Sequence, residues 1–253
     1  MNLKETYSSL CSEFYDLDKP GAPEEALKFY LREIENSIKP VFEPMCGSGR
    51  FLIPVAERGF DIEGTDTSLF MINRCINKCR EKNLSPLIHR QKLQELSLNK
   101  KFGLVFIPSG SFGLITEDSD VKECLKRIRG HLFNGGKFIL EIENTQSIKN
   151  NSREEIPAVR EVFRNEFSKI VYSAETDYDI KINIETTKCE YQNFINGELI
   201  NTENEIIKVR HFSIGEFYEL LKSAGFTDIN ALKPYSYKKA SENNDTILFS
   251  CAA

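Results

Sequence analysis

The residues most able to do chemistry lie in one short stretch, Val41 to Phe51, with the sequence VFEPMCGSGRF. An apolar run typical of a buried strand leads into a glycine turn, and a helix pattern follows the turn. Glycine allows close backbone approach to a ligand at Gly47 and Gly49, and the first turn of a helix offers free N–H donors. Asp66 ends the next expected strand. In a doubly wound sheet such an acid lies beside the glycine turn, where it can accept hydrogen bonds from ribose hydroxyls.

Two cofactors fit a glycine turn paired with a ribose-binding acid, a nicotinamide dinucleotide and S-adenosylmethionine. The dinucleotide fingerprint G-x-G-x-x-G/A needs a third small residue so that helix and strand can pack closely. Counted from Gly47, that position is Leu52. The bulky leucine disfavours the dinucleotide, and Glu43 inside the first strand favours S-adenosylmethionine.

The elements that position these residues alternate between short apolar runs and amphipathic helix patterns. The expected strands fall at 41–42, 61–65, 87–88, 104–107 and 137–142, and two more lie near 226–232 and 246–251. Strands that alternate with helices are typical of a parallel sheet covered on both faces. The sequence therefore predicts an α/β fold, a doubly wound sheet of about seven strands with helices on both faces.

Two segments depart from this alternation. Residues 1–40 have the spacing of two N-terminal helices, the second of which ends at Pro40. Between the fifth and sixth strands, Ile180, Ile182 and Ile184 alternate with polar residues, which predicts a half-buried strand. The dipeptide Asn196-Gly197 is a hairpin signal because both residues tolerate positive φ. We expect an antiparallel β insertion of about three strands within 163–209.

The chain resembles the class I, Rossmann-like S-adenosylmethionine-dependent methyltransferases of the small-molecule type. Their first motif, acid-x-G-x-G-x-G, corresponds to Glu43 through Gly49. The resemblance continues through Asp66-Thr67-Ser68 with Met71 and through 102–106 and 132–137. It ends with 213–217 and 221–226, which look like the family's helix that leads into its sixth strand. Phe14-Tyr15-Asp16 resembles the N-terminal segment that covers the cofactor in many members. The chain departs from the family at Met45, Lys92 and Gly103, which stand where the family has its first motif glycine, an adenine-reading acid and a strand-four aspartate.

The resemblance implies one methyltransferase domain over residues 1–253. Residues 1–40 would be a helical cover, 41–144 the cofactor-binding core, 145–210 the insertion over the substrate, and 211–253 the last helix and strands of the core. The implied reaction is transfer of a methyl group from S-adenosylmethionine to a small-molecule acceptor by in-line displacement. The residues implied in cofactor binding are Tyr15, Glu43, Met45, Cys46, Gly47, Gly49, Asp66, Thr67, Met71, Leu93, Pro108 and Ser109.

No residue of the sequence stands out as a general base. His211 follows the insertion in Val209-Arg210-His211-Phe212, where similar enzymes turn residues toward the methyl group, so it is the one catalytic candidate. A hydrogen-bonded loop histidine is the competing interpretation. Glu141 and Glu143 end the fifth strand on the ligand side, and either a substrate-facing role or a solvated strand end fits them.

Composition limits the other classes of function. The 253 residues carry a net charge of −5, which argues against a phosphate-gripping nucleic-acid protein. No apolar run is long enough for a membrane helix and no signal peptide is apparent, so we expect a cytoplasmic protein. Three dispersed histidines argue against a metal, and Cys75 and Cys79 fit buried thiols better than a cluster site.

Three alternatives remain at the level of sequence. One is a cofactor-binding regulatory module without turnover, and Met45 and Lys92 keep it open. A second is a nucleic-acid or protein methyltransferase, against which Ile107-Pro108-Ser109-Gly110 lacks an Asn/Asp-Pro-Pro-Tyr pattern. A dehydrogenase ranks last because of Leu52. The identity of the acceptor and the oligomeric state are not encoded in these patterns.

Overall fold

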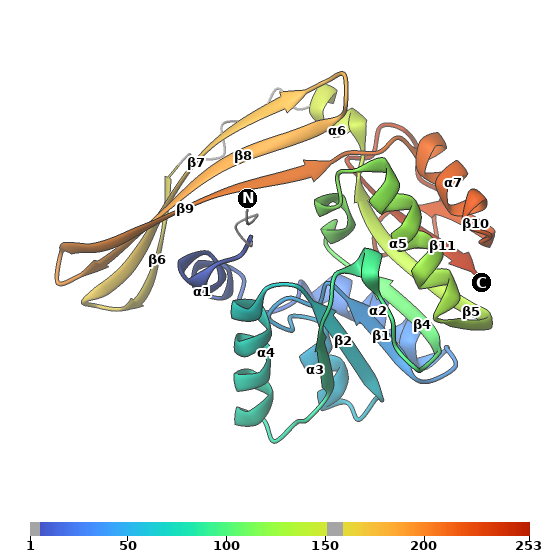
Figure 1. Cartoon of the computed structure of the whole chain (residues 1–253), viewed down its shortest axis with the longest axis horizontal. Helices are drawn as coiled ribbons and strands as arrows, with labels where there is room; N and C mark the ends of the chain where they lie inside the picture. Colours follow the sequence, from blue (N-terminus) through green and yellow to red (C-terminus); the bar gives the residue numbers. More distant parts are fainter. Residues whose placement is uncertain (1–5, 151–158) are drawn as a thin grey trace.

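A computed structural model describes residues 6–150 and 159–253 and contains two β-sheets. The larger sheet has the strand order β10-β11-β5-β4-β1-β2-β3 (Figure 1). Its strands are β1 (Val41–Pro44), β2 (Ile62–Asp66), β3 (Leu87–Arg90), β4 (Phe102–Ile107), β5 (Leu132–Glu143), β10 (Thr227–Leu232) and β11 (Thr246–Ala252). Strands β1 to β5 run parallel, and β11 pairs antiparallel with both β5 and β10. The predicted seven-stranded, doubly wound sheet is confirmed.

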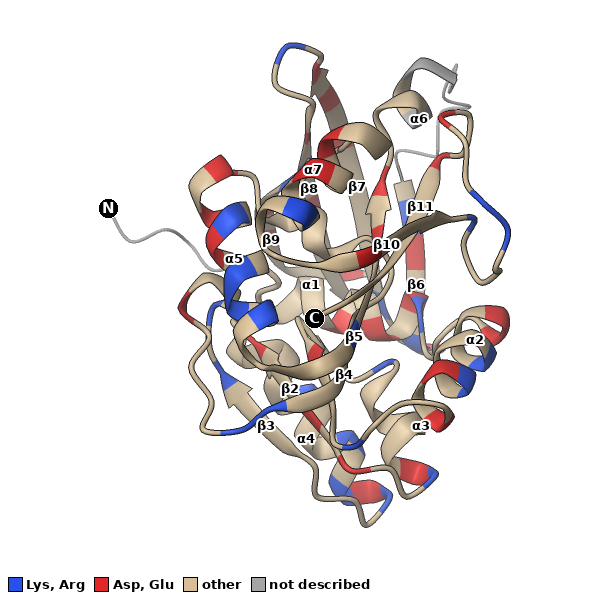
Figure 2. Cartoon of the chain, turned by 90° about the vertical axis from the view of Figure 1, so that its right-hand side faces the viewer, with Lys and Arg blue, Asp and Glu red and all other residues tan. Residues whose placement is uncertain are grey.

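Helices cover both faces of this sheet. On one face lie α2 (Glu24–Glu35), α3 (Leu52–Glu57) and α4 (Leu69–Glu81), and on the other lie α5 (Asp118–Gly130) and α7 (Ile214–Ser223). All six residues of β4 are buried between these layers, as expected for a central parallel strand. Figure 2 shows acidic and basic residues intermixed along α5, whose apolar side packs into the core. No helix within the described residues is long and apolar enough to cross a membrane.

The strand order reverses between β1 and β4, since β1 pairs with β2 on one side and with β4 on the other. In open α/β sheets, ligands bind beyond the carboxyl ends of the strands at this switch point. The fold therefore places the glycine turn after β1, the end of β2 and the loop after β4 along one edge of the sheet.

The insertion between β5 and β10 contains helix α6 (Thr145–Asn150) and a separate antiparallel sheet. The sheet has four strands instead of about three: β6 (Val159–Asn165), β7 (Ser168–Asp179), β8 (Ile184–Ile195) and β9 (Glu198–Arg210). The predicted hairpin at Asn196-Gly197 is confirmed, with φ of 51° and 81°. The assignment of the whole chain to one domain stays a prediction.

The predicted strand through Ile180, Ile182 and Ile184 is wrong over its first part. Residues 180–183 form the turn between β7 and β8, and Ile180 and Ile182 are 65% and 56% exposed. The Asp179 side chain accepts the Lys181 N–H at 2.9 Å, and Asn183 has a φ of 54°. This local turn chemistry outweighs the apolar alternation.

Helix α1 (Ser9–Asp18) lies between the core and the insertion (Figure 1). Its apolar side packs on the insertion sheet, where the Phe14 ring stacks on Tyr172 with centroids 5.0 Å apart. The shared cluster of buried residues is Leu10, Cys11, Phe14, Ile170, Cys189 and Tyr191. The two N-terminal helices are as predicted, and the insertion gives the first of them a docking surface.

Candidate functional site

The glycine turn after β1 is built from residues with left-handed backbone. Met45, Gly47 and Gly49 have φ of 58°, 53° and 85°. Met45 therefore adopts, at some steric cost, the conformation that explains glycine at this family position. A Cβ on Gly49 would lie 2.5 Å from Cys75 Sγ, whereas a Cβ on Gly47 would meet nothing within 4 Å. Gly49 is required for packing, and Gly47 borders open space where a ligand can approach.

Asp66 joins the end of β2 to this turn. Its Oδ2 accepts the N–H of Gly47 at 2.8 Å, and its Oδ1 accepts the N–H of Ser68 at 2.9 Å. Burial raises the pKa of Asp66, and these backbone donors counteract the increase. As predicted, Asp66 lies beside the glycine turn.

Glu43 in β1 is 2% exposed, and burial raises its pKa well above the usual range. The backbone N–H of Leu52 donates to its carboxylate. Among the described residues, neither Glu43 Oε2 nor the buried Ser48 Oγ has a hydrogen-bond partner. Unpaired buried polar atoms are costly, so these two atoms fit a site that a polar ligand completes. An ammonium group would suit the Glu43 carboxylate.

The remaining candidates occupy different surroundings. Thr67 is exposed, Met71 is 3% exposed at the start of α4, and Ser109 has a φ of 59° directly after buried Pro108. Two side chains are used in packing. Cys46 would lie 2.8 Å from a Cβ on Gly64, and Leu93 belongs to the core on the α5 side. Contacts of these residues with a cofactor stay predictions.

Helix α1 and the residues just before it lie over the glycine turn. The Ser68 hydroxyl donates to the Tyr7 carbonyl at 2.7 Å, and Arg50 Nη1 donates to the Tyr15 hydroxyl at 2.9 Å. The rings of Tyr7 and Tyr15 meet edge to face, 6.1 Å apart. Sequence reasoning did not assign a role to Arg50, although its position directly after Gly49 was an available signal.

Glu141 near the end of β5 is 2% exposed, so the interpretation as a solvated strand end is wrong for this residue. It accepts hydrogen bonds from Tyr30 Oη at 2.6 Å, Tyr235 Oη at 3.0 Å and the backbone N–H of Ser109. Burial raises its pKa. The carboxylate thus ties the loop after β4 to α2 and to the segment between β10 and β11. Neither tyrosine carried a sequence signal.

Glu143 and His211 meet where β5 and β9 end. Phe212 N–H donates to the Glu143 carbonyl at 2.9 Å, and a Cβ on Gly110 would lie 2.9 Å from Glu143 Oε1. The Glu143 carboxylate therefore reaches the loop after β4. Burial raises its pKa, and the nearby His211 opposes that increase. His211 is 4% exposed.

The His211 ring is held from the insertion. Its Nε2 lies 3.2 Å from Glu185 Oε2, and the Tyr178 ring meets it edge to face at 5.6 Å. His211 N–H donates to the Asn183 carbonyl at 2.9 Å. A hollow of about 220 Å³ opens beside this group, lined by Thr145, Ile148, Tyr178, Ile180, Asn183 and Ser213. Among the described residues, no three His, Cys, Asp or Glu side chains are placed to share a metal ion.

Comparison with known proteins shows which family model these residues match. Residues 41–136 match the family model described as a methyltransferase domain. Residues 41–136 carry a methyltransferase domain, and the chain has the class I methyltransferase fold. The matched residues contain the glycine turn, Asp66 and the loop after β4, so the predicted family and fold class are confirmed.

Sequence similarity to known proteins extends beyond the matched residues. A candidate methyltransferase of Geobacillus sp. (strain WCH70) is 21% identical over 251 residues, 96% of this chain and 98% of its own. A dTDP-3-amino-3,6-dideoxy-alpha-D-glucopyranose N,N-dimethyltransferase of Streptomyces fradiae is 23% identical over 141 residues, 53% of this chain and 54% of its own.

Solved structures share the fold over almost the whole chain. An S-adenosylmethionine-dependent methyltransferase from Clostridium acetobutylicum superposes with a TM-score of 0.75 at 19% identity, covering 95% of this chain and 96% of its own. A sugar N-methyltransferase from Streptoalloteichus sp. has a TM-score of 0.78 at 14% identity, covering 100% and 96%. The N-terminal helices and the insertion are therefore part of the shared fold.

Proposed function

We propose that this methyltransferase transfers a methyl group from S-adenosylmethionine to a small-molecule acceptor. The observation that carries the proposal is the glycine turn, which has open space at Gly47, a hydrogen bond to Asp66 and an unpaired oxygen of Glu43 beside it. The names of the relatives, which include sugar N-methyltransferases, support a small acceptor.

Each part of the turn has a task in cofactor binding. Asp66 would hold the ribose hydroxyls, and the buried Glu43 carboxylate would pair with the ammonium of the methionine end. S-adenosylmethionine supplies a methyl group already activated on a sulfonium. The chain's own contribution is to hold the acceptor in line with that methyl, and orientation of this kind can lower a barrier by roughly 7–11 kcal/mol.

Glu143 and His211 would contribute to removal of the proton from the methyl acceptor. The acceptor atom gains the methyl group and loses a proton, while S-adenosylhomocysteine leaves. Glu143 reaches the loop after β4 and has its pKa raised by burial, so it is suited to take that proton. His211, oriented by Glu185, would stabilise the carboxylate.

Calorimetric titration with S-adenosylhomocysteine tests the cofactor half, with NADH as a parallel ligand. We expect Asp66→Asn to weaken S-adenosylhomocysteine binding by about 1–3 kcal/mol, because buried polar groups lose partners. Asp61→Asn is the matched control, since Asp61 lies just before β2 at its other end and is 64% exposed at the side chain. Binding of NADH without S-adenosylhomocysteine would overturn the proposal, and binding without turnover on any acceptor would favour a regulatory module.

A further inference from the structure

Three cationic side chains from three parts of the chain converge near the end of α1. Lys19 follows α1, Arg50 follows the glycine turn, and Arg160 lies on β6. Lys19 Nζ and Arg50 Cζ lie 5.3 and 5.5 Å from the centroid of the Tyr15 ring. Arg160 Cζ lies 5.3 Å from the ring of Phe14, the preceding residue. We call Lys19, Arg50 and Arg160 the cationic cluster.

The charges of the cluster are poorly balanced. Asp18 is 2.9 Å from Arg160 Nη1, whereas neither Lys19 nor Arg50 has a carboxylate within 4.0 Å among the described residues. Arg50 donates instead to the Gly21 carbonyl and the Tyr15 hydroxyl. Partial burial lowers the pKa of Lys19, and repulsion from Arg50 and Arg160 lowers it further against the attraction of Asp18.

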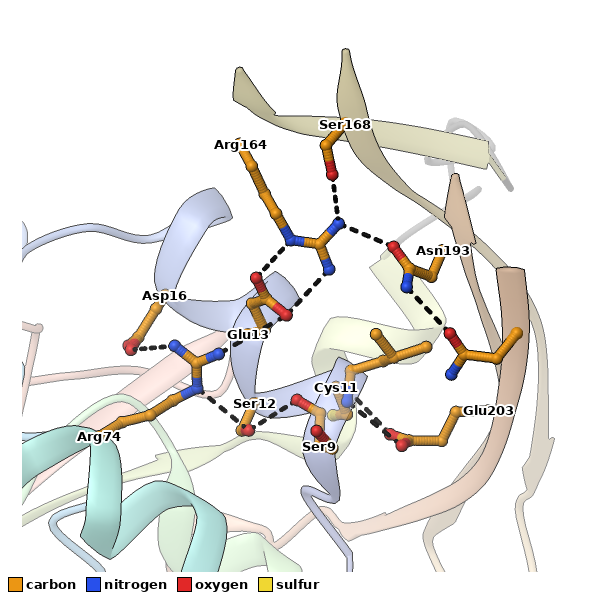
Figure 3. A network of polar contacts seen from close by, with 12 residues as sticks. Ser9, Cys11, Ser12, Glu13, Asp16, Arg74, Arg164, Ser168, Asn193 and Glu203 are labelled. Carbon is orange, nitrogen blue, oxygen red and sulfur yellow. Dashed lines mark hydrogen bonds and ion pairs between the residues drawn. The ribbon is translucent and has the colours of Figure 1, made fainter. Parts of the chain in front are cut away.

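The opposite side of α1 shows how this chain pairs structural cations. In Figure 3, Arg164 lies against Glu13 and Arg74 against Asp16, and Lys78 also pairs with Asp16 at 3.0 Å. These cations, like Arg160 with Asp18, have carboxylate partners, whereas Lys19 and Arg50 have none within 4.0 Å in the part of the chain that the structure describes. The cationic cluster has three positive charges and one negative charge in contact, which is the balance of an anion site.

The cluster lies near the buried carboxylates of the candidate site. Arg50 lies close enough to Glu43 and Tyr235 to lower the pKa of each against the effect of burial. Tyr235 in turn binds Glu141 beside the loop after β4. Lys19 lies directly after α1 and Arg160 lies on β6, both outside the matched residues 41–136.

We propose that Lys19, Arg50 and Arg160 bind an oxyanion of the methyl acceptor, a phosphate or a carboxylate. The proposal rests on the proposed function, because that function requires an acceptor between the glycine turn and the insertion. Guanidinium groups present paired N–H donors that match such an anion, and lysine adds a point charge. The acceptor then places its oxyanion at the cluster and its methylated atom at Glu143 and His211.

Titration of the protein with inorganic pyrophosphate tests the cluster, with saturating S-adenosylhomocysteine present so that the cofactor's own carboxylate site is filled. We expect binding that weakens as sodium chloride increases, because salt screens the attraction. Lys19→Gln should weaken it about fivefold, the effect of one unit charge a few ångströms away in water. Arg160→Gln should weaken it as much or more. Lys208→Gln, at an exposed position on β9, is the charge-matched control and should bind like the wild type.

Several results would overturn the proposal. One is an absence of pyrophosphate binding to the loaded protein, and another is equal affinity of Lys19→Gln and Lys208→Gln. Displacement of S-adenosylhomocysteine by pyrophosphate would assign the cations to the cofactor carboxylate instead. Failure of S-adenosylhomocysteine to bind would count against the proposed function alone, and the pyrophosphate titration of the cofactor-free protein would still decide the cluster. Thermal unfolding of each variant confirms that it is folded.

Discussion

Glu13 of α1 and Arg164 of β6 form a two-point ion pair, in which Nη2 of Arg164 donates to Oε2 of Glu13 at 2.9 Å and Nε donates to the other oxygen (Figure 3). Arg164 also donates to Ser168 Oγ and Asn193 Oδ1. At the start of the helix, Glu205 of β9 accepts the N–H groups of Tyr7 and Ser8. Helix α1 and the residues just before it are therefore held on the insertion by polar contacts as well as by apolar packing.

The first prediction concerns the pH dependence of this joint. The hydrogen bond from Arg164 lowers the pKa of Glu13 below its usual 4.5. A lowered carboxyl pKa contributes stability that is complete above 4.5 and is lost as the pH falls through the folded-state value. We expect Glu13→Gln to reduce the free energy of unfolding at pH 7 by about 0.5–1 kcal/mol, since the pair is partly exposed. Thermal unfolding from pH 7 to pH 3 should show the difference vanish below 4.5, and a constant difference would contradict the assignment.

The second prediction concerns Glu43. Burial raises its pKa, so the wild type should lose stability relative to Glu43→Gln as the pH rises above 4.5 toward the folded-state value. The same substitution removes the charge that would pair with an ammonium, so S-adenosylhomocysteine binding should weaken by about 1.5–3 kcal/mol. Melting temperatures at pH 5 and pH 8, combined with calorimetry, measure both effects. A variant that binds as tightly as the wild type would remove Glu43 from the site.

The third prediction compares the two motif glycines. Both Gly47→Ala and Gly49→Ala force alanine into left-handed backbone, at a cost of about 1–2 kcal/mol. Gly49→Ala should cost about 1–3 kcal/mol more, because its Cβ collides with Cys75 and Ile53. Gly47→Ala should leave the protein folded and weaken cofactor binding, since its methyl group enters the open space. Urea unfolding and calorimetry separate the two effects, and equal stability losses would argue against the packing described.

The fourth prediction concerns the buried carboxylate of Glu141. In Glu141→Gln one amide oxygen faces two tyrosine hydroxyl donors, so one donor is left unpaired at a cost of about 1–3 kcal/mol. Tyr235→Phe removes a donor instead and should cost only about 0.5–1.5 kcal/mol. A double-mutant cycle by urea unfolding gives their coupling, and additive losses would mean that Tyr235 and Glu141 act independently.

Local sequence patterns were sufficient to predict the part of the fold that carries the glycine turn and Asp66. The alternation of apolar runs with helix spacing determined the parallel sheet, and the glycine turn with Asp66 follows from the chain's own order of strand, turn and helix. Asn196-Gly197 determined a hairpin because only a few residues tolerate positive φ. These features depend on neighbours in sequence, so they can be predicted without knowing what packs against them.

Only the tertiary structure decided which distant groups meet. Tyr30 and Tyr235 bind Glu141 across separations of 111 and 94 residues, and no local pattern names such partners. Docking on the insertion sheet directs Phe14 away from the cofactor turn and brings Lys19 and Arg160 near Arg50. At 180–183 the local turn chemistry and the pairing of β7 with β8 along their full length together overrode an apolar alternation. Which side chains far apart in the sequence contact one another depends on burial and charge in the folded chain. Local sequence patterns therefore do not predict these contacts.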